Sequence, residues 1–224
     1  MSKYKYDAVI WDYNGTLADD VEASLLASNE IIVRHGKEPI TMAQYYDYVD
    51  YPISRFWEHV FDLDEFPMAK IGEEYYKAYP KYFRGLSDGA AELVKKLRRA
   101  GVVQMILTSA HPRLIGETLR EAGIEDCFDA VSSSSDLLAG SKIDRGVAWL
   151  EKSGVAPERA VTVGDTLHDF DAARTMGTDC VLCSFGHQSK ELLLTAGVPV
   201  VDKFGEIERF LTIDSCQLSI KKRR

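Results

Sequence analysis

The chain is short of cysteine, of basic residues relative to acidic ones, and of long apolar runs. Four cysteines in 224 residues are too few and too scattered for a disulfide framework, so reduced thiols are expected. The 35 acidic residues outnumber the 27 basic ones, which disfavours nucleic-acid and membrane-surface partners, because these partners attract positive charge. No apolar run approaches the roughly 20 residues that span a bilayer, and the start MSKYKYD lacks the apolar stretch of a signal peptide. These absences predict a cytoplasmic protein.

Two of the cysteines, Cys180 and Cys183, have the spacing of a redox or metal-binding pair. They lie in the run CVLCSF, which is typical of a strand, where residues three apart point to opposite faces. We therefore expect buried strand residues and not a thiol site.

Short apolar runs alternate with helical stretches along most of the chain. This alternation predicts an α/β fold, a doubly wound parallel sheet covered by helices on both faces. The helices are expected to begin and end at Asp88 and Gly101, at Pro112 and Gly123, and at Ser141 and Gly154. The predicted strands are 8–11, 102–107, 129–132, 160–163, 180–183 and 198–201.

About 90 residues separate the first two predicted strands, where a simple crossover needs only about a dozen. The interval has helical patterns, including a stripe from Val21 to Ile32 and a helix that Thr41 can cap. We predict a small all-helical cap domain at 18–84, inserted into a catalytic core domain of residues 1–17 and 85–224. Its many aromatic residues are expected to pack the core of a small bundle, because aromatics bury the most area per residue, and base stacking on nucleic acid is the alternative.

Polar residues follow three of the predicted strands directly. Asp12 follows the first strand, Thr108 and Ser109 follow the second, and Gly164 and Asp165 follow the run AVTV. In an open parallel sheet, ligands bind outside the carboxyl ends of the strands, so these residues are expected to converge on one site.

The segments around these residues suit a phosphate and a hard metal ion. Gly15 permits a sharp turn whose N–H groups can face an anion, and Asp165 and Asp169 lie four apart at the start of a helix. Carboxylate oxygens, water and phosphate oxygens are the ligands that magnesium prefers, and Lys142 supplies a cation near another helix start. Taken one at a time, each of these residues is also compatible with an ordinary loop, capping or surface role.

The order of strand-end Asp, strand-end Thr, Lys and then GDxxxD resembles the signature of the haloacid dehalogenase superfamily. The resemblance covers essentially the whole chain, includes the cap inserted after the first strand, and is nearest to phosphoglycolate-phosphatase-like proteins. It implies a phosphohydrolase in which Asp12 attacks phosphorus to give an aspartyl-phosphate that water then hydrolyses.

The resemblance also implies the other site residues. Magnesium is expected on Asp12, on the Asn14 carbonyl and on Asp165, with Asp169 supporting the metal site. Thr108 and Lys142 are expected to bind the transferring phosphoryl group, with Ser109 beside them. A small phosphorylated substrate, no nucleic acid and no membrane partner, and a monomer or homodimer are expected. Arg55 is our choice in the cap for a contact to the leaving group.

Asn14 departs from the family pattern, which usually has a second Asp two residues after the nucleophile as general acid and base. An amide cannot carry protons near neutral pH, so the reaction is expected to be slowed or biased toward good leaving groups. Such leaving groups depart from acyl phosphates, aryl phosphates and pyrophosphate without protonation. His111, His168 and His187 follow strand ends and are conceivable replacement proton carriers.

Other interpretations stay open. The chain could be a catalytically impaired phosphate-binding or regulatory protein of the same fold, or an engineered Asp to Asn variant of an active phosphatase. A dehalogenase is disfavoured because it would not need Asp165. A phosphomutase is disfavoured because it needs proton transfer at position 14 even more than a hydrolase does.

Overall fold

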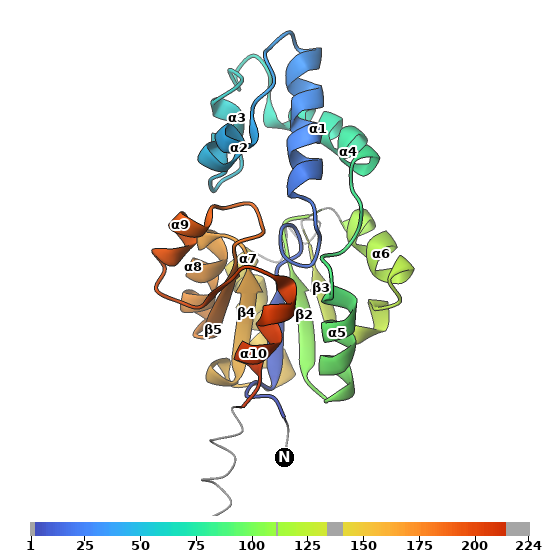
Figure 1. Cartoon of the computed structure of the whole chain (residues 1–224), viewed down its shortest axis with the longest axis vertical. Helices are drawn as coiled ribbons and strands as arrows, with labels where there is room; N and C mark the ends of the chain where they lie inside the picture. Colours follow the sequence, from blue (N-terminus) through green and yellow to red (C-terminus); the bar gives the residue numbers. More distant parts are fainter. Residues whose placement is uncertain (1–2, 111, 134–140, 214–224) are drawn as a thin grey trace, which may run out of the picture.

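Six parallel strands form one sheet in the computed structural model, which describes residues 3–110, 112–133 and 141–213. The strand order is β3-β2-β1-β4-β5-β6, so the chain winds outward from β1 in one direction and then, from β4, in the other (Figure 1). The doubly wound parallel sheet is therefore confirmed, with strand ends within two residues of those predicted. The strands are β1 (Ala8–Trp11), β2 (Val103–Leu107), β3 (Ala130–Ser132), β4 (Ala160–Gly164), β5 (Asp179–Cys183) and β6 (Val200–Val201).

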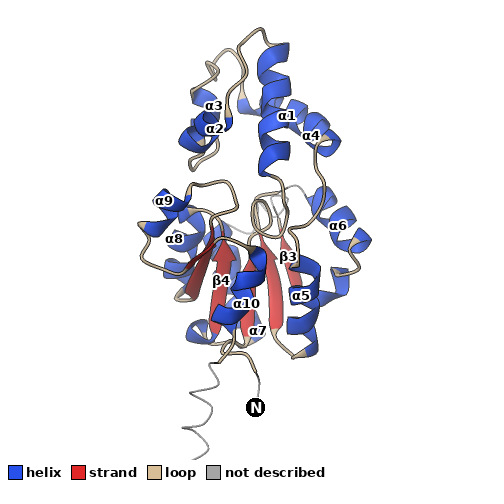
Figure 2. Cartoon of the chain, in the orientation of Figure 1, coloured by secondary structure: helices blue, strands red, loops and turns tan. Residues whose placement is uncertain are grey.

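Helices cover both faces of the sheet (Figure 2). Alternate side chains of β1 point to opposite faces, and each face has its own apolar cluster. Val9 and Trp11 pack with α5 (Ala90–Arg99), α6 (Pro112–Glu121) and α10 (Ile207–Leu211). Ala8 and Ile10 pack with α7 (Lys142–Ser153) and α8 (Leu167–Met176), and the short α9 (Lys190–Leu194) lies beside the β5 end of the sheet.

Local signals in the sequence determine most helix ends. Ser141 caps α7 through a capping box with Asp144, and Gly154 ends that helix with a φ of 71°. The helix α5 begins at Ala90, the first residue of the predicted segment, but its N-cap is Gly89 and not Asp88, one residue later than predicted. Gly89 takes a left-handed backbone conformation there, which glycine adopts without strain.

The cysteines of β5 are buried, as expected. Cys180 and Cys183 belong to different apolar clusters, and burial raises the pKa of both thiols. Both therefore remain protonated packing residues. Cys216 lies outside the described residues.

The inserted interval forms a separate group of helices beyond the carboxyl ends of the strands (Figure 1). These are α1 (Val21–Arg34), α2 (Met42–Tyr48), α3 (Ser54–Glu58) and α4 (Met68–Ala78), followed by a short 3-10 turn at Tyr79–Lys81. Thr41 caps α2 through a capping box with Gln44, and the group has its own apolar core around Ile32, Phe56 and Trp57. It is the helical cap that the sequence predicts.

The chain passes between core and cap twice, and the two passages pair with each other. Ala18 and Leu86 form an antiparallel bridge, and the Ser87 N–H donates to the Leu17 carbonyl over 2.8 Å. Domain boundaries at 17/18 and 84/85 stay a prediction that limited proteolysis can check. In the described part of the chain, no helix is both long and apolar enough to span a bilayer.

Candidate active site

Three neighbouring strands, β2, β1 and β4, bring the predicted chemical residues to one edge of the sheet. Asp12 directly follows β1, and its N–H donates to the Val163 carbonyl over 2.8 Å. Thr108 follows β2 and is almost completely buried, while Asp165 follows β4. Residues distant in sequence therefore line one cavity.

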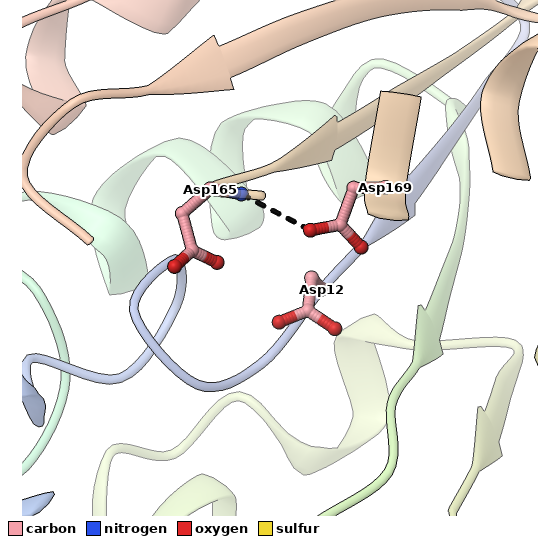
Figure 3. Close-up of side chains that lie close together, drawn as sticks. All are labelled: Asp12, Asp165 and Asp169. Atoms are coloured by element: carbon pink, nitrogen blue, oxygen red, sulfur yellow. Dashed lines mark hydrogen bonds between the residues drawn. The ribbon is translucent and has the colours of Figure 1, made fainter. Parts of the chain in front are cut away.

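The side chains of Asp12, Asp165 and Asp169 lie close together (Figure 3). One oxygen from each can be chosen so that all three lie within 4.8 Å of one another. The Lys142 Nζ donates to Asp12 Oδ1 over 2.6 Å and to Asp169 Oδ1 over 2.7 Å. Three buried carboxylates facing one ammonium leave negative charge in excess, and an all-oxygen donor set of this kind fits a hard divalent cation.

The pKa shifts reflect this crowding of acids. Burial raises the pKa of Asp12 to about 8, the neighbouring carboxylates add to the rise, and Lys142 opposes it. Burial likewise raises the pKa of Asp165 to about 6. Burial also acts on Asp169, but Lys142 outweighs it and lowers the pKa of that carboxyl. A cation among these oxygens would favour the ionised form of all three acids.

Hydrogen bonds orient the two acids of the GDxxxD segment. Thr166 is the N-cap of α8, and its Oγ1 donates to Asp169 Oδ2 over 2.6 Å. Asp165 accepts from Thr16 Oγ1 over 3.0 Å and from the His187 N–H over 2.7 Å. The carboxylates are thus held in place by neighbours on three different loops.

Two glycines leave room for Asp165. Gly15 has a φ of 66°, and a Cβ there would collide with the Asp165 carboxylate and with the His187 ring. A Cβ on Gly186 would meet the same carboxylate. The turn after β1 and the loop after β5 can approach the acid only because neither residue has a side chain.

The other predicted substrate contacts also line the cavity. Thr108 Oγ1 accepts from the Ala110 N–H over 3.1 Å, and Ser109 is exposed beside it. Arg55 lines the cavity from the cap, where it forms an ion pair with Asp50 over 2.8 Å. Its positive charge is therefore already matched by an acid of the cap.

Asn14 is engaged with a buried acid that the sequence analysis did not single out. Its Nδ2 donates to Asp20 Oδ2 over 2.5 Å, and Asp20 is 1% exposed. The Gly15 N–H donates to the same carboxylate over 2.6 Å, and the Tyr79 hydroxyl donates to it over 2.9 Å. The environment of position 14 therefore offers an acceptor to an amide donor.

His187 completes this group of side chains. Its Nε2 lies 3.2 Å from Asp20 Oδ1, and its Nδ1 lies 2.8 Å from the hydroxyl of Tyr45 in the cap. Burial acts to lower the pKa of His187, but Asp20 and Asp165 outweigh it and raise the pKa to about 9. The His187 ring thus joins the cap to the core.

The remaining histidines differ in their surroundings. His168 lines the cavity and stacks on Tyr51, with ring centroids 3.8 Å apart, and burial lowers its pKa. His111 lies outside the described residues. A proton-carrying role for any histidine stays a prediction.

The cavity itself has a volume of about 1190 Å³ and is bounded by core and cap. We call the core residues Asp12, Thr108, Lys142, Asp165 and Asp169 the cavity floor. We call the cap residues Tyr45, Tyr46, Tyr48, Tyr51, Phe56, Trp57, Tyr75 and Tyr76 the aromatic wall. Phe56, Trp57 and Tyr45 are buried, as a packing role requires, but Tyr51 and Tyr76 are exposed. The expectation that these cap aromatics pack a core is wrong for those two.

Comparisons with known proteins agree with this fold. Residues 9–183 match the model of the family described as haloacid dehalogenase-like hydrolase. The chain is 29% identical over 203 residues to the tyrosine-protein kinase PtkA of Mycobacterium tuberculosis, covering 89% of this chain and 69% of that one. It is 29% identical over 190 residues to the phosphoglycolate phosphatase of Xylella fastidiosa, covering 82% of each.

A solved structure described as a predicted phosphoglycolate phosphatase from Haemophilus somnus superposes with a TM-score of 0.78. It is 17% identical and covers 94% of this chain and 99% of its own, so it supports the fold alone. The chain belongs to the haloacid dehalogenase-like hydrolase family. The resemblance to phosphoglycolate-phosphatase-like members is confirmed, and so is the expectation of a phosphohydrolase.

Proposed function

We propose that this protein is a magnesium-dependent phosphatase that hydrolyses a small phosphorylated metabolite through an aspartyl-phosphate on Asp12. The observation that carries this proposal is the position of Asp12, which lies at the floor of the cavity between Lys142 and two further carboxylates. A monomer or homodimer in the cytoplasm remains part of the same proposal.

The reaction has two displacements at phosphorus. An oxygen of Asp12 attacks phosphorus, the bond from phosphorus to the leaving-group oxygen breaks, and that oxygen departs with the bonding pair. Water then attacks the phosphorus of the acyl phosphate, which regenerates the Asp12 carboxylate and releases inorganic phosphate and a proton. Lys142 and the Thr108 hydroxyl, which line the cavity, bind the phosphoryl oxygens in both steps of this proposal.

Asp12, Asp165 and the Asn14 carbonyl would hold the magnesium ion, with Asp169 beside it. When bound, the ion neutralises phosphoryl and carboxylate charge. Lys142 would keep Asp12 ionised and oriented, because its Nζ is shared between Asp12 and Asp169.

Asn14 determines which esters are hydrolysed fastest. It has no proton to give to the leaving group, so leaving groups that depart as stable anions are expected to be preferred. The hydrogen bond from Asn14 to Asp20 supports a natural asparagine, because an aspartate there would place two carboxylates against each other.

The impaired or regulatory form is the second candidate, and Asn14 is the observation that favours it. In that case the site binds phosphate and stalls before hydrolysis. The names of the relatives include both a kinase and a phosphatase, two activities that differ in whether a protein hydroxyl or water accepts the phosphoryl group.

Steady-state phosphate release tests the proposal. The panel is acetyl phosphate, 4-nitrophenyl phosphate, pyrophosphate and phosphoglycolate, with magnesium or with EDTA. Release that needs magnesium and falls at least about a thousandfold in Asp12→Asn is expected, since loss of a nucleophile typically costs this much or more. Release that appears only in Asn14→Asp would instead identify the impaired form. Labelled ATP in a parallel reaction shows whether the chain itself becomes phosphorylated.

A further inference from the structure

The cavity is much larger than a phosphoryl group needs. Ligand pockets typically measure roughly 300–1,000 Å³, and this one reaches about 1190 Å³. The floor residues line only part of the cavity, and cap residues line much of the rest. Whatever fills that space is the part of the substrate that leaves.

Apolar surface gathers around this space. Eight large apolar side chains are exposed in the described part of the chain, and four of them line the cavity: Tyr51, Ile53, Tyr76 and Leu192. Single exposed apolar side chains are ordinary, but several around one opening indicate a ligand-binding surface.

Two rings of the aromatic wall stack face to face on histidines. Tyr51 stacks on His168 with 8° between the ring planes, and Tyr48 stacks on His59 with centroids 4.2 Å apart and 10° between the planes. Tyr51 remains 58% exposed despite this contact, so it is still accessible to a flat ligand. Stacked or edge-to-face rings stabilise one another beyond the area that they bury.

The charges near the leaving-group space are mostly negative. Asp47, Asp50 and Glu58 of the cap line the cavity, as does Asp171 of α8. Within the described residues, Arg55 is the single Lys or Arg that the cap contributes to the lining, and it is paired with Asp50. Asp171 is likewise paired, with Arg174 over 3.0 Å. A leaving group that carries a carboxylate, such as glycolate, would therefore meet two acids, Asp47 and Glu58, that no ion pair among the described residues neutralises.

We infer that the substrate is a phosphate monoester whose leaving group is a flat ring without negative charge, and that the aromatic wall selects it. The inference rests on the proposed function, since it concerns the same site. An aryl ester and a nucleoside ester share this chemistry, and they differ in whether the ester oxygen belongs to a phenol or to a sugar.

Binding and turnover are measured separately, so that the two proposals fail in distinguishable ways. Calorimetry on Asp12→Asn, which cannot turn over, compares 4-nitrophenyl phosphate, adenosine 5′-monophosphate, glycerol phosphate and phosphoglycolate. The ring-bearing esters are expected to bind about tenfold more tightly than glycerol phosphate, and phosphoglycolate more weakly still. Equal or tighter binding of phosphoglycolate would overturn the inference, even if the protein proves to be an active phosphatase.

Turnover by the unaltered protein separates the two sources. The assay compares 4-nitrophenyl phosphate with acetyl phosphate, which both have good leaving groups. It also compares adenosine 5′-monophosphate with glycerol phosphate, which both have poor leaving groups. Faster turnover of the ring-bearing ester within each pair supports ring selection independently of leaving-group stability. The pair with the larger difference shows whether an aryl ester or a nucleoside ester is preferred. No ring preference in either pair would contradict the inference.

Variants locate the selection. Tyr51→Leu, made in the Asp12→Asn background, is expected to reduce the affinity ratio of 4-nitrophenyl phosphate to glycerol phosphate about fivefold. Tyr82→Leu is the matched control, because Tyr82 bonds Glu30 in the cap and does not line the cavity. The double change Asp47→Asn with Glu58→Gln is expected to improve phosphoglycolate binding relative to glycerol phosphate about threefold. If Tyr51→Leu leaves the affinity ratio of 4-nitrophenyl phosphate to glycerol phosphate unchanged, or if Tyr82→Leu changes it equally, the aromatic wall does not select the leaving group.

Discussion

The cavity floor and the aromatic wall face the same space, but they are built differently. At the floor, the functional side chains are largely buried and are held by named partners, as Asp165 is by Thr16 and His187. At the wall, rings such as Tyr51 and Tyr76 are exposed at the opening. A group of constant chemistry, the phosphoryl group, needs fixed charges, whereas the leaving group is recognised by shape and by ring faces.

The largest expected effect comes from removing the Lys142 ammonium from the floor. Lys142→Met leaves Asp12 and Asp169 buried without their cation, which should lower the free energy of unfolding by about 3–5 kcal/mol. Phosphate release should fall at least about a hundredfold, because the developing charge loses a fixed donor. Urea unfolding and steady-state kinetics measure the two effects.

Lys190→Met is the matched control, since Lys190 pairs with Asp202 at a similar distance on the exposed surface. This change should lower the free energy of unfolding by less than about 1 kcal/mol and leave the kinetics of phosphate release unchanged, because water screens exposed pairs. An equal loss of unfolding free energy in Lys142→Met and Lys190→Met would mean that burial does not make the ion pairs of the floor stronger than those of the surface.

The second expected effect concerns Asn14→Asp. A carboxylate at position 14 faces Asp20 in place of the amide donor, so the free energy of unfolding should fall by about 1–3 kcal/mol. The same change supplies a proton carrier, so hydrolysis of alkyl phosphates should rise about tenfold to a hundredfold, with a smaller gain for aryl phosphates.

Asn29→Asp controls for the general cost of this exchange. The Asn29 side chain bonds the Ile40 backbone inside the cap and does not line the cavity. The Asn29→Asp variant should have a lower free energy of unfolding without any gain in the rate of phosphate release. A gain for aryl phosphates as large as that for alkyl phosphates would contradict the role given to Asn14.

The floor was more predictable from sequence than the rest of the site. Asp12, Thr108 and Asp165 each follow a strand directly, and parallel strands that are neighbours must bring their ends together. Asp20 gave no such signal, because an acid just before a helix is usually a cap. Asp20 contacts Tyr79 of the cap and His187 of the core, which are distant in sequence and which only the folded chain brings near.

The wall was predictable in composition but not in orientation. Aromatic density in a short helical segment indicates a packed core, and Phe56 and Trp57 confirm it. Which rings face inward depends on how short helices such as α2 and α3 pack, and five to seven residues are too few to define an apolar face by periodicity.

The smallest expected effect concerns the contact that joins wall to floor. Tyr45→Phe keeps the buried ring but removes the hydroxyl that meets His187 Nδ1, so the free energy of unfolding should fall by about 0.5–1.5 kcal/mol. Because the cap is then held less firmly over the floor, KM should rise more than kcat falls. Tyr48→Phe is the control, since the Tyr48 hydroxyl meets only Gln44 of the same helix among the described residues, over 3.4 Å. If both variants raise KM equally, the link from Tyr45 to His187 does not hold the cap, and wall and floor act independently.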